Sequence, residues 1–136
     1  MTNEQLIEKA FKAREKSYSP YSNFKVGAAL LDINGQVFTG CNIESASYTP
    51  TNCGERTAFF KAVSEGVTKF EAIAIVGGAD GEATPLCYPC GVCRQVMAEF
   101  CDDDFKIIMG DAAGNIHETT LKELLPHRFG PADLQK

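Results

Sequence analysis

The sequence predicts an α/β fold with three layers, α/β/α, built around one mixed five-stranded sheet. Five short segments have the apolar or alternating pattern of strands, and segments with helical periodicity lie between several of them. The first two strands are joined across Asn34-Gly35, a dipeptide typical of a tight hairpin turn, so they are expected to run antiparallel. A chain of 136 residues is long enough for one core, and we expect a single domain over residues 1–136.

The N-terminal part of the chain predicts one helix and the first hairpin. Thr2 can cap this helix. Its apolar stripe is formed by Leu6, Ile7, Ala10 and Phe11. The segment 19–23, which contains Ser19-Pro20, ends the helix. Strands are expected at Phe24–Leu31 and Gln36–Gly40, one on each side of the turn.

The central part of the chain predicts two helices separated by a buried strand. The first helix is expected from about Cys53 to Glu65, and Gly66 follows at the position where helices commonly end. The apolar run Ala72–Val76 predicts a central strand that is covered on both faces. A loop over residues 77–89 then leads into a helix from about Cys90 to Phe100.

The C-terminal part of the chain predicts two more strands and a short helix. Lys106–Met109 has the pattern of a buried strand, and the turn over residues 111–115 is too short for a helical crossover. The next strand, Ile116–Thr119, is therefore expected to run antiparallel to its predecessor. Thr120 and Glu123 form the pattern of a capping box at the start of the last helix.

Composition and charge exclude several classes of function. The hydrophobic content of 44% and the charged content of 23% are those of an ordinary globular protein. No apolar stretch is long enough to cross a bilayer, and the N-terminus lacks the pattern of a signal peptide, so we expect a cytoplasmic protein. The net charge of -5 and the scattered lysines and arginines argue against a nucleic-acid partner and favour a small, uncharged substrate.

Three cysteines and a glutamate form the most informative pattern in the sequence. Cys53 is followed two residues later by Glu55, and Cys90 and Cys93 are spaced three residues apart. Three thiolates can hold a tetrahedral Zn²⁺ and leave its fourth position open for water, as catalytic zinc sites do. A glutamate that is not itself a ligand can then move protons. This arrangement resembles the three-cysteine variant of the zinc-dependent nucleobase deaminases.

The expected helix ends support a metal site at these cysteines. Cys53 falls at the N-terminus of one helix, and Cys90 and Cys93 fall at the N-terminus of another. Helix N-termini favour thiolates over thiols. Arg56 lies three residues after Cys53, and hydrogen bonds from its guanidinium to the thiolates would increase the acidity of the metal. The alternative for Arg56 is an ordinary surface ion pair.

The other cysteines leave alternatives open. Six cysteines could form three disulfides, but C-x-x-C spacing in a chain expected in the cytoplasm favours metal binding. Cys87 and Cys90 offer an alternative ligand pair, and Cys87 as a fourth ligand would close a purely structural zinc site. We expect Cys41 and Cys101 to be small buried residues, because free cysteines are commonly buried.

Five motifs, spread over nearly the whole chain, can be compared with known families. They are Tyr18–Ala29, Gly40–Tyr48, Thr51–Arg56, Pro89–Gln95 and Leu124–Pro126. In these motifs the chain resembles the small, homotetrameric, zinc-dependent cytidine deaminases. The resemblance implies the layered fold predicted above with strand order 2-1-3-4-5, a Zn²⁺ cofactor, and a homotetramer with shared active sites.

The resemblance also implies the catalytic residues. Cys53, Cys90 and Cys93 would bind Zn²⁺, Glu55 would be the proton shuttle, and Arg56 would support the ligands. Hydrolytic deamination of free cytidine and deoxycytidine to uridine and deoxyuridine, with release of ammonia, would follow, and it would serve pyrimidine salvage. Glu55 would take a proton from the attacking water, protonate N3 of the ring, and later help to protonate the departing amine.

Five residues are implied to contact the substrate. Phe24 would lie against the pyrimidine, and Asn42 and Glu44 would bind the ribose 3′-hydroxyl. The backbone N–H of Gly54 would face the pyrimidine 2-oxygen, and Phe129 would reach the pocket of a neighbouring subunit. A deaminase of another small nucleoside-like substrate, such as blasticidin S, is the alternative function, and the Asn42-x-Glu44 pair disfavours it. An RNA-editing deaminase would need a basic face that the sequence lacks.

Two residues depart from the family pattern. Gly54 stands where the family usually has Ala, which keeps the backbone N–H and costs about 0.5–1 kcal/mol of local helix stability. Cys87 creates the alternative ligand pair described above, but the surrounding motif Pro89–Gln95 favours Cys90 and Cys93 as ligands.

Overall fold

The computed structural model describes residues 1–135 and contains one five-stranded sheet with the order β2-β1-β3-β4-β5. The strands are β1 (Phe24–Asp32), β2 (Val37–Cys41), β3 (Phe70–Ala79), β4 (Lys106–Gly110) and β5 (Ile116–Thr120). β1 is antiparallel to both β2 and β3, β3 and β4 are parallel, and β5 is antiparallel to β4. The mixed sheet confirms the predicted fold class and strand order.

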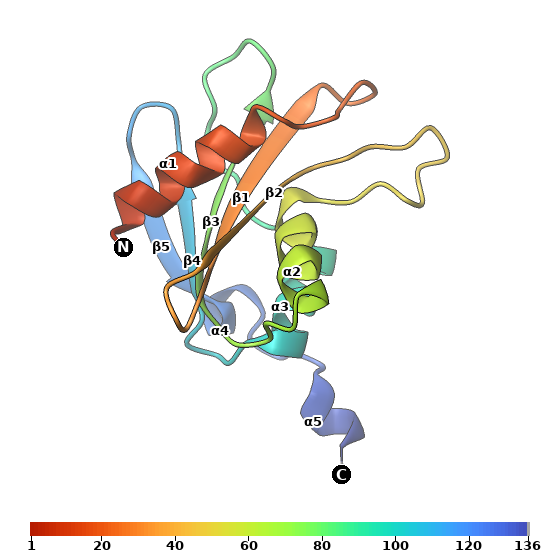
Figure 1. Cartoon of the computed structure of the whole chain (residues 1–136), viewed down its shortest axis with the longest axis vertical. Helices are drawn as coiled ribbons and strands as arrows, with labels where there is room; N and C mark the ends of the chain where they lie inside the picture. Colours follow the sequence, from red (N-terminus) through yellow and green to blue (C-terminus); the bar gives the residue numbers. More distant parts are fainter. Residues whose placement is uncertain (136) are drawn as a thin grey trace.

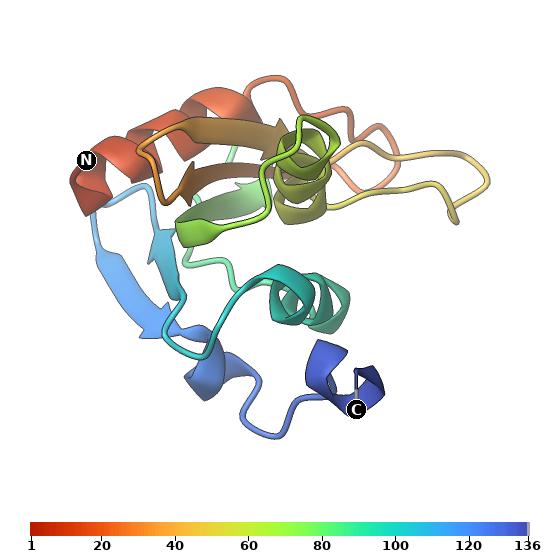
Figure 2. The same ribbon diagram turned by 60° about the horizontal axis from the view of Figure 1, so that its bottom comes forward.

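The helices cover both faces of this sheet (Figures 1 and 2). They are α1 (Asn3–Arg14), α2 (Gly54–Ser64), α3 (Gly91–Phe100), α4 (Leu121–Leu124) and α5 (Pro131–Leu134). α1 lies across one face, whereas α2 and α3 lie on the other, and the short α5 extends away from the body of the sheet (Figure 1). The sequence did not predict α5. Among residues 1–135, no helix has the length and apolar character needed to cross a membrane.

The two faces of β3 show why the chain forms three layers. Ile73 and Ile75 point into the core that contains Phe59 of α2 and Met97 of α3. Ala74, between them, belongs to the core formed with α1 on the opposite face. Side chains alternate between the faces of a strand, so a strand covered on both faces needs the continuous apolar run that the sequence has.

The strand directions determine where the functional site forms. β2 and β3 each run antiparallel to β1, so they run in the same direction and their carboxyl ends share one edge of the sheet. The chain leaves this edge towards α2 and α3, and β1 begins there. β2 also lies very close to α2: a Cβ added at Gly40 would be only 2.5 Å from the Ala58 nitrogen and the Gly54 oxygen. Because the chain leaves β2 and β3 at the same edge of the sheet, the N-termini of α2 and α3 lie near each other.

Candidate active site

The three cysteines predicted as zinc ligands meet where α2 and α3 begin. Cys53 is the N-cap of α2, Cys90 is the N-cap of α3, and Cys93 lies in the first turn of α3. The Sγ atoms of Cys53 and Cys90 are 3.9 Å apart, and those of Cys90 and Cys93 are 3.5 Å apart. All three sulfur atoms lie within 4.8 Å of one another. The fold thus brings three thiols, from two distant motifs, to one point.

These sulfur positions fit a tetrahedral zinc ion. With Zn–S bonds of about 2.3 Å, two sulfur ligands of such an ion lie about 3.8 Å apart. Within residues 1–135 the cluster of possible ligands has three members, and Cys87 is not one of them. A closed structural site needs a fourth protein ligand, whereas a catalytic site has three and keeps one position open. The cluster is therefore suited to Zn²⁺ with one open position.

The surroundings of Cys53 favour its thiolate form. The neighbouring Cys93 thiol and the Arg56 guanidinium lower the pKa of Cys53 to about 5, against the opposing effect of burial. The Arg56 Nη2 atom lies 3.1 Å from the Cys53 sulfur. In the described part of the chain, no salt bridge joins Arg56 to a carboxylate. The geometry favours a contact with the thiolate over the surface ion pair that was the alternative.

Glu55 lies in the first turn of α2 and is 4% exposed. Burial, reinforced by the neighbouring Cys53 thiolate, raises the pKa of the Glu55 carboxyl to about 7. A carboxyl group with a pKa near neutrality can both accept and donate a proton, which suits general acid–base chemistry. Glu55 also lines the same cavity as Cys53 and Cys90.

A cavity of about 350 Å³ opens in front of this cluster. Its wall is formed by Ser22, Phe24, Val26, Asn42, Glu44, Thr51, Asn52, Cys53, Glu55, Cys87, Tyr88 and Cys90. The residues come from the start of β1, the segment after β2, the start of α2 and the loop before α3. The volume lies in the range of small-molecule sites, and the wall combines apolar surface with a few polar groups, as such sites do.

Asn42 has a structural task in addition to its place in the cavity wall. Its Nδ2 donates to the Phe24 oxygen at 2.7 Å, and its Oδ1 accepts from the Val26 nitrogen at 2.9 Å and from the Ser17 hydroxyl. The side chain is 8% exposed. These bonds fix the beginning of β1 beside the segment that follows β2, and they leave one Nδ2 proton for a further partner.

Glu44 lies in the same wall and is held by the segment that precedes β1. Its Oε1 accepts from the Tyr21 and Ser22 nitrogens, each at 3.1 Å, and its Oε2 accepts from the Ser22 hydroxyl. The Ser22 hydroxyl, followed by the backbone N–H groups of Ser22 and Tyr21, lowers the pKa of Glu44 below its ordinary value. The carboxylate is therefore ionised at neutral pH and fixed in direction.

The three other residues expected to contact the substrate differ in whether they lie at the cavity. Phe24 lines the cavity and is 42% exposed. Gly54 is buried at the start of α2, and a Cβ there would lie 3.2 Å from Val26 Cγ1, so alanine would need a small shift of that side chain. Phe129 lies between α4 and α5, is 57% exposed, and does not belong to the cavity wall of its own chain.

Sequence reasoning missed several residues around the site. Ser22 was interpreted as part of a helix break and of the motif Tyr18–Ala29 but was given no role, although it binds Glu44 and lines the cavity. Arg94 donates to the Pro89 oxygen at 2.8 Å and to the Leu124 oxygen at 2.9 Å, which fixes the loop before Cys90. Glu44 lies 22 residues from Ser22 and Leu124 lies 30 residues from Arg94, so no local pattern reveals these two bonds.

The other cysteines also have defined places. Cys101 is buried as expected, whereas Cys41 is only partly buried. Cys87 lines the cavity, and burial raises the pKa of its thiol to about 12, so it remains protonated. A Cβ at Gly77 would lie 2.9 Å from the Cys87 sulfur, which shows that this thiol packs against β3.

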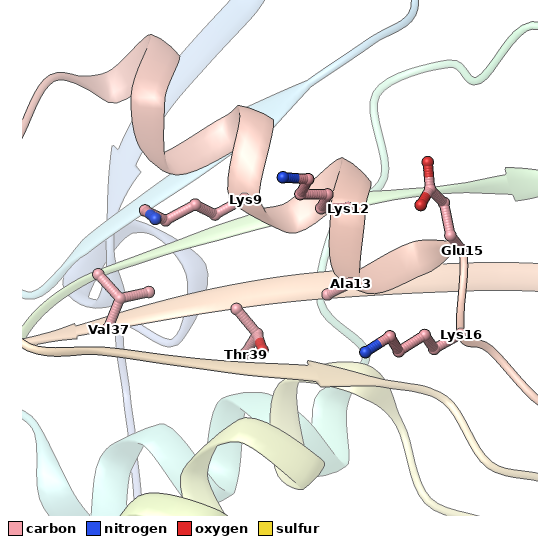
Figure 3. A pocket seen from close by; sticks show the side chains of 7 residues that line it. All are labelled: Lys9, Lys12, Ala13, Glu15, Lys16, Val37 and Thr39. Atoms are coloured by element: carbon pink, nitrogen blue, oxygen red, sulfur yellow. The ribbon is translucent and has the colours of Figure 1, made fainter.

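A second hollow, of about 480 Å³, lies between α1 and β2 (Figure 3). It is lined by Lys9, Lys12, Ala13, Glu15, Lys16, Val37 and Thr39. Three lysines and one carboxylate cannot form a zinc site, which needs several thiolate, imidazole or carboxylate ligands. Lysines beside an edge strand such as β2 do, however, discourage pairing with other sheet edges. The cluster of possible metal ligands in the described residues 1–135 thus lies at the cysteines and not at this hollow.

Comparison with protein families agrees with this geometry. The family model described as "Cytidine and deoxycytidylate deaminase zinc-binding region" matches residues 1–109. The chain belongs to the cytidine deaminase family. The matched residues include the cysteine cluster and the glutamate beside it, so the zinc-binding region of this family coincides with the site found in the structure.

Relatives of the cytidine deaminase family match almost the entire chain. The cytidine deaminase of Sporosarcina psychrophila is 51% identical over 134 residues, which are 98% of this chain and 96% of that protein. The crystal structure of cytidine deaminase from Burkholderia pseudomallei superimposes with a TM-score of 0.86 at 48% identity, covering 95% of this chain and 100% of that one. A blasticidin-S deaminase of Bacillus cereus is 29% identical over 133 residues, covering 93% and 94% of the two chains.

Proposed function

We propose that this chain is a zinc-dependent hydrolase that converts free cytidine and deoxycytidine to uridine and deoxyuridine and releases ammonia. One observation carries the proposal: a buried glutamate, Glu55, lies in the same cavity as a three-thiol cluster that leaves a metal position open. The near full-length similarity to cytidine deaminases supports it. We further propose that residues 1–136 act as one domain.

Cys53, Cys90 and Cys93 would hold the zinc ion. Zinc bound there supplies a Lewis acid that makes a water molecule more acidic at neutral pH. Three thiolates also bring negative charge, which weakens a Lewis acid. Arg56 counters this effect, because its guanidinium donates to the Cys53 sulfur and draws charge away from it.

Glu55 would carry the protons of the reaction. It removes a proton from the water that attacks C4 of the cytosine ring, and it passes that proton to ring N3 as the new C–O bond forms. It then moves the proton of the new C4 hydroxyl to the amino group, which leaves as ammonia as the C4–N bond breaks and the C4 carbonyl of uracil forms. One carboxyl group can serve as base and then as acid because the steps are sequential, and its raised pKa suits both tasks.

The rest of the cavity would bind the nucleoside. Phe24 would lie against the pyrimidine, and the backbone N–H of Gly54 would donate to the pyrimidine 2-oxygen. Glu44 would accept from a ribose hydroxyl, and Asn42 would use its remaining Nδ2 proton there. The preference between ribose and deoxyribose would then be weak, because these groups act on the 3′ side of the sugar.

The proposal also covers the oligomeric state of the protein, its cellular role and its location. We propose a homotetramer in which Phe129 enters the cavity of a neighbouring subunit. Large exposed apolar side chains, Tyr21 and Tyr48 beside the cavity and Phe129 on the C-terminal segment, support interfaces with other subunits. Pyrimidine salvage is the proposed role and the cytoplasm the proposed location, since zinc thiolates suit a reducing compartment. The net charge of -5 supports a free nucleoside rather than a nucleic acid as substrate.

The competing function is deamination of blasticidin S. The purified zinc-loaded protein should be incubated with cytidine, deoxycytidine and blasticidin S in parallel, and the ammonia released from each should be measured. We expect kcat/KM for cytidine to exceed that for blasticidin S by at least about 100-fold, because the nucleoside fits the Glu44 and Asn42 positions. A higher kcat/KM for blasticidin S would replace the proposed substrate.

A further inference from the structure

The hydroxyl group of Ser22 joins two walls of the cavity. It accepts a hydrogen bond from the Phe24 nitrogen at 3.0 Å, and it donates one to Glu44 Oε2. Phe24 is the first residue of β1, and Glu44 follows β2, so one hydroxyl connects the aromatic wall to the acidic wall. Ser22 itself also lines the cavity.

The acceptor sites of Glu44 show what remains for a ligand. An ionised carboxylate offers about two acceptor sites on each oxygen. On Oε1, both are used by the Tyr21 and Ser22 nitrogens. On Oε2, the Ser22 hydroxyl uses one. A single acceptor site therefore remains, on Oε2, and the Ser22 hydroxyl determines the direction in which it points.

We propose that Ser22 is a positioning residue for sugar recognition: its hydroxyl holds Glu44 so that the remaining lone pair of Oε2 accepts one ribose hydroxyl. The inference rests on the proposed function, because it assigns Glu44 to the sugar of a bound nucleoside. Ser22 needs no contact with the ligand. Its one proton is given to Glu44, and its oxygen already accepts from Phe24.

Loss of the Ser22 hydroxyl should affect folding and substrate binding to different extents. Ser22 is exposed, so water can replace its hydroxyl when the cavity is empty, and the loss of stability would be small. A bound nucleoside would exclude that water. Glu44 would then lack its fixed direction at the moment when it must accept from the sugar. Removal of the hydroxyl should therefore affect substrate binding far more than folding.

The test compares Ser22→Ala with the wild-type protein on three substrates: cytidine, deoxycytidine and 2′,3′-dideoxycytidine. We expect KM for cytidine and deoxycytidine to rise by about tenfold, with kcat within about twofold, because a hydrogen bond to a charged group is disturbed at a distance from the reacting carbon. KM for 2′,3′-dideoxycytidine, which has no sugar hydroxyl at these positions, should not change. Ser22→Thr keeps the hydroxyl and should restore KM.

Controls separate this inference from the proposed function. Ser64→Ala removes another exposed hydroxyl, which bonds only to the Lys61 oxygen, and should leave all three KM values unchanged. In a Glu44→Gln background, Ser22→Ala should add less than twofold to KM. An unchanged KM in Ser22→Ala, or an equal rise on 2′,3′-dideoxycytidine, overturns the inference. If the wild-type protein does not turn over cytidine at all, the proposed function itself fails.

Discussion

The Cys53 sulfur accepts a hydrogen bond from the Arg56 guanidinium and lies within 4.8 Å of the Cys93 sulfur. Arg56 is three residues from Cys53, so the same helical turn that presents the ligand also presents its charge partner. The consequence is a thiolate that forms at a pH well below the ordinary range for cysteine. A metal that binds thiolates then competes with fewer protons.

Arg56→Ala should shift the pH range of zinc binding upward. Without the guanidinium the pKa of Cys53 rises, so protons compete with zinc up to a higher pH. We expect the pH at which half of the protein is loaded, in a chelator competition at fixed free zinc, to increase by roughly one unit. Activity at pH 7 should fall while zinc remains bound. An unchanged loading midpoint and an unchanged rate would assign Arg56 to a structural role.

The identity of the ligands can be tested with single cysteine variants. Cys90→Ala removes one member of the cluster and should lose both zinc and activity, measured by elemental analysis and ammonia release. Cys87→Ala is the matched control. Its thiol is buried against β3 and lies outside the cluster, so zinc should remain at about one per chain. Loss of zinc in Cys87→Ala would show that the ligand set is wrong.

At the scale of elements, the site depends on how closely α2 approaches β2. Gly40 makes this approach possible, because any side chain there would collide with the backbone of α2. α3 is held to the C-terminal segment, because Arg94 and Gln95 donate to the Leu124 and Phe129 oxygens. Each helix that supplies zinc ligands is thus held by contacts that involve backbone atoms.

Gly40→Ala should destabilise the protein strongly. Its Cβ would lie 2.5 Å from two backbone atoms of α2, which cannot move independently of the helix that carries Cys53. We expect a loss of about 2 kcal/mol or more in unfolding free energy, seen as a lower thermal midpoint, together with weaker zinc binding. Gly130→Ala is the control, because a Cβ there has one ordinary contact, at 3.8 Å. Equal midpoints for the two variants would contradict the account of the β2–α2 contact.

The elements that the sequence predicts correctly have strong local signals. The apolar run within β3, the Asn34-Gly35 turn and the cysteines at two helix starts are all readable from neighbouring residues. α5 has only four residues, and its cap is a bond between the Gly130 nitrogen and the Asp133 carboxylate, so its local signal is weak. The hydrogen bonds of Asn42 to the beginning of β1, and those of Glu44 to the segment before it, depend on tertiary structure and could not be predicted.

At the scale of the whole molecule, large side chains at the cavity and on the C-terminal segment are exposed in a single chain. Phe24 and Tyr88 are about half exposed at its wall, and Phe129 projects from the C-terminal segment without reaching it. A small chain buries a limited fraction of its surface, so an interface that covers these side chains would serve both stability and substrate binding.

The assembly can be tested by light scattering and kinetics together. We expect a mass of about four times 14.8 kDa. Phe129→Ala should raise KM for cytidine several-fold, with kcat little changed, because an aromatic contact with the bound nucleoside is lost. The tetramer should persist in this variant, which separates a contact with substrate from a loss of assembly. A fully active monomer at nanomolar concentration would refute the shared site.

We propose that Glu55 moves the protons of cytidine deamination beside a zinc ion held by three cysteines. The most direct test is to measure zinc content, cytidine binding and ammonia release on the same preparation of Glu55→Gln. We expect about one zinc per chain, retained binding of cytidine, and a kcat lowered by at least about 1,000-fold, since the amide cannot accept a proton. Turnover within tenfold of the wild-type protein, with zinc present, would show that Glu55 does not carry these protons.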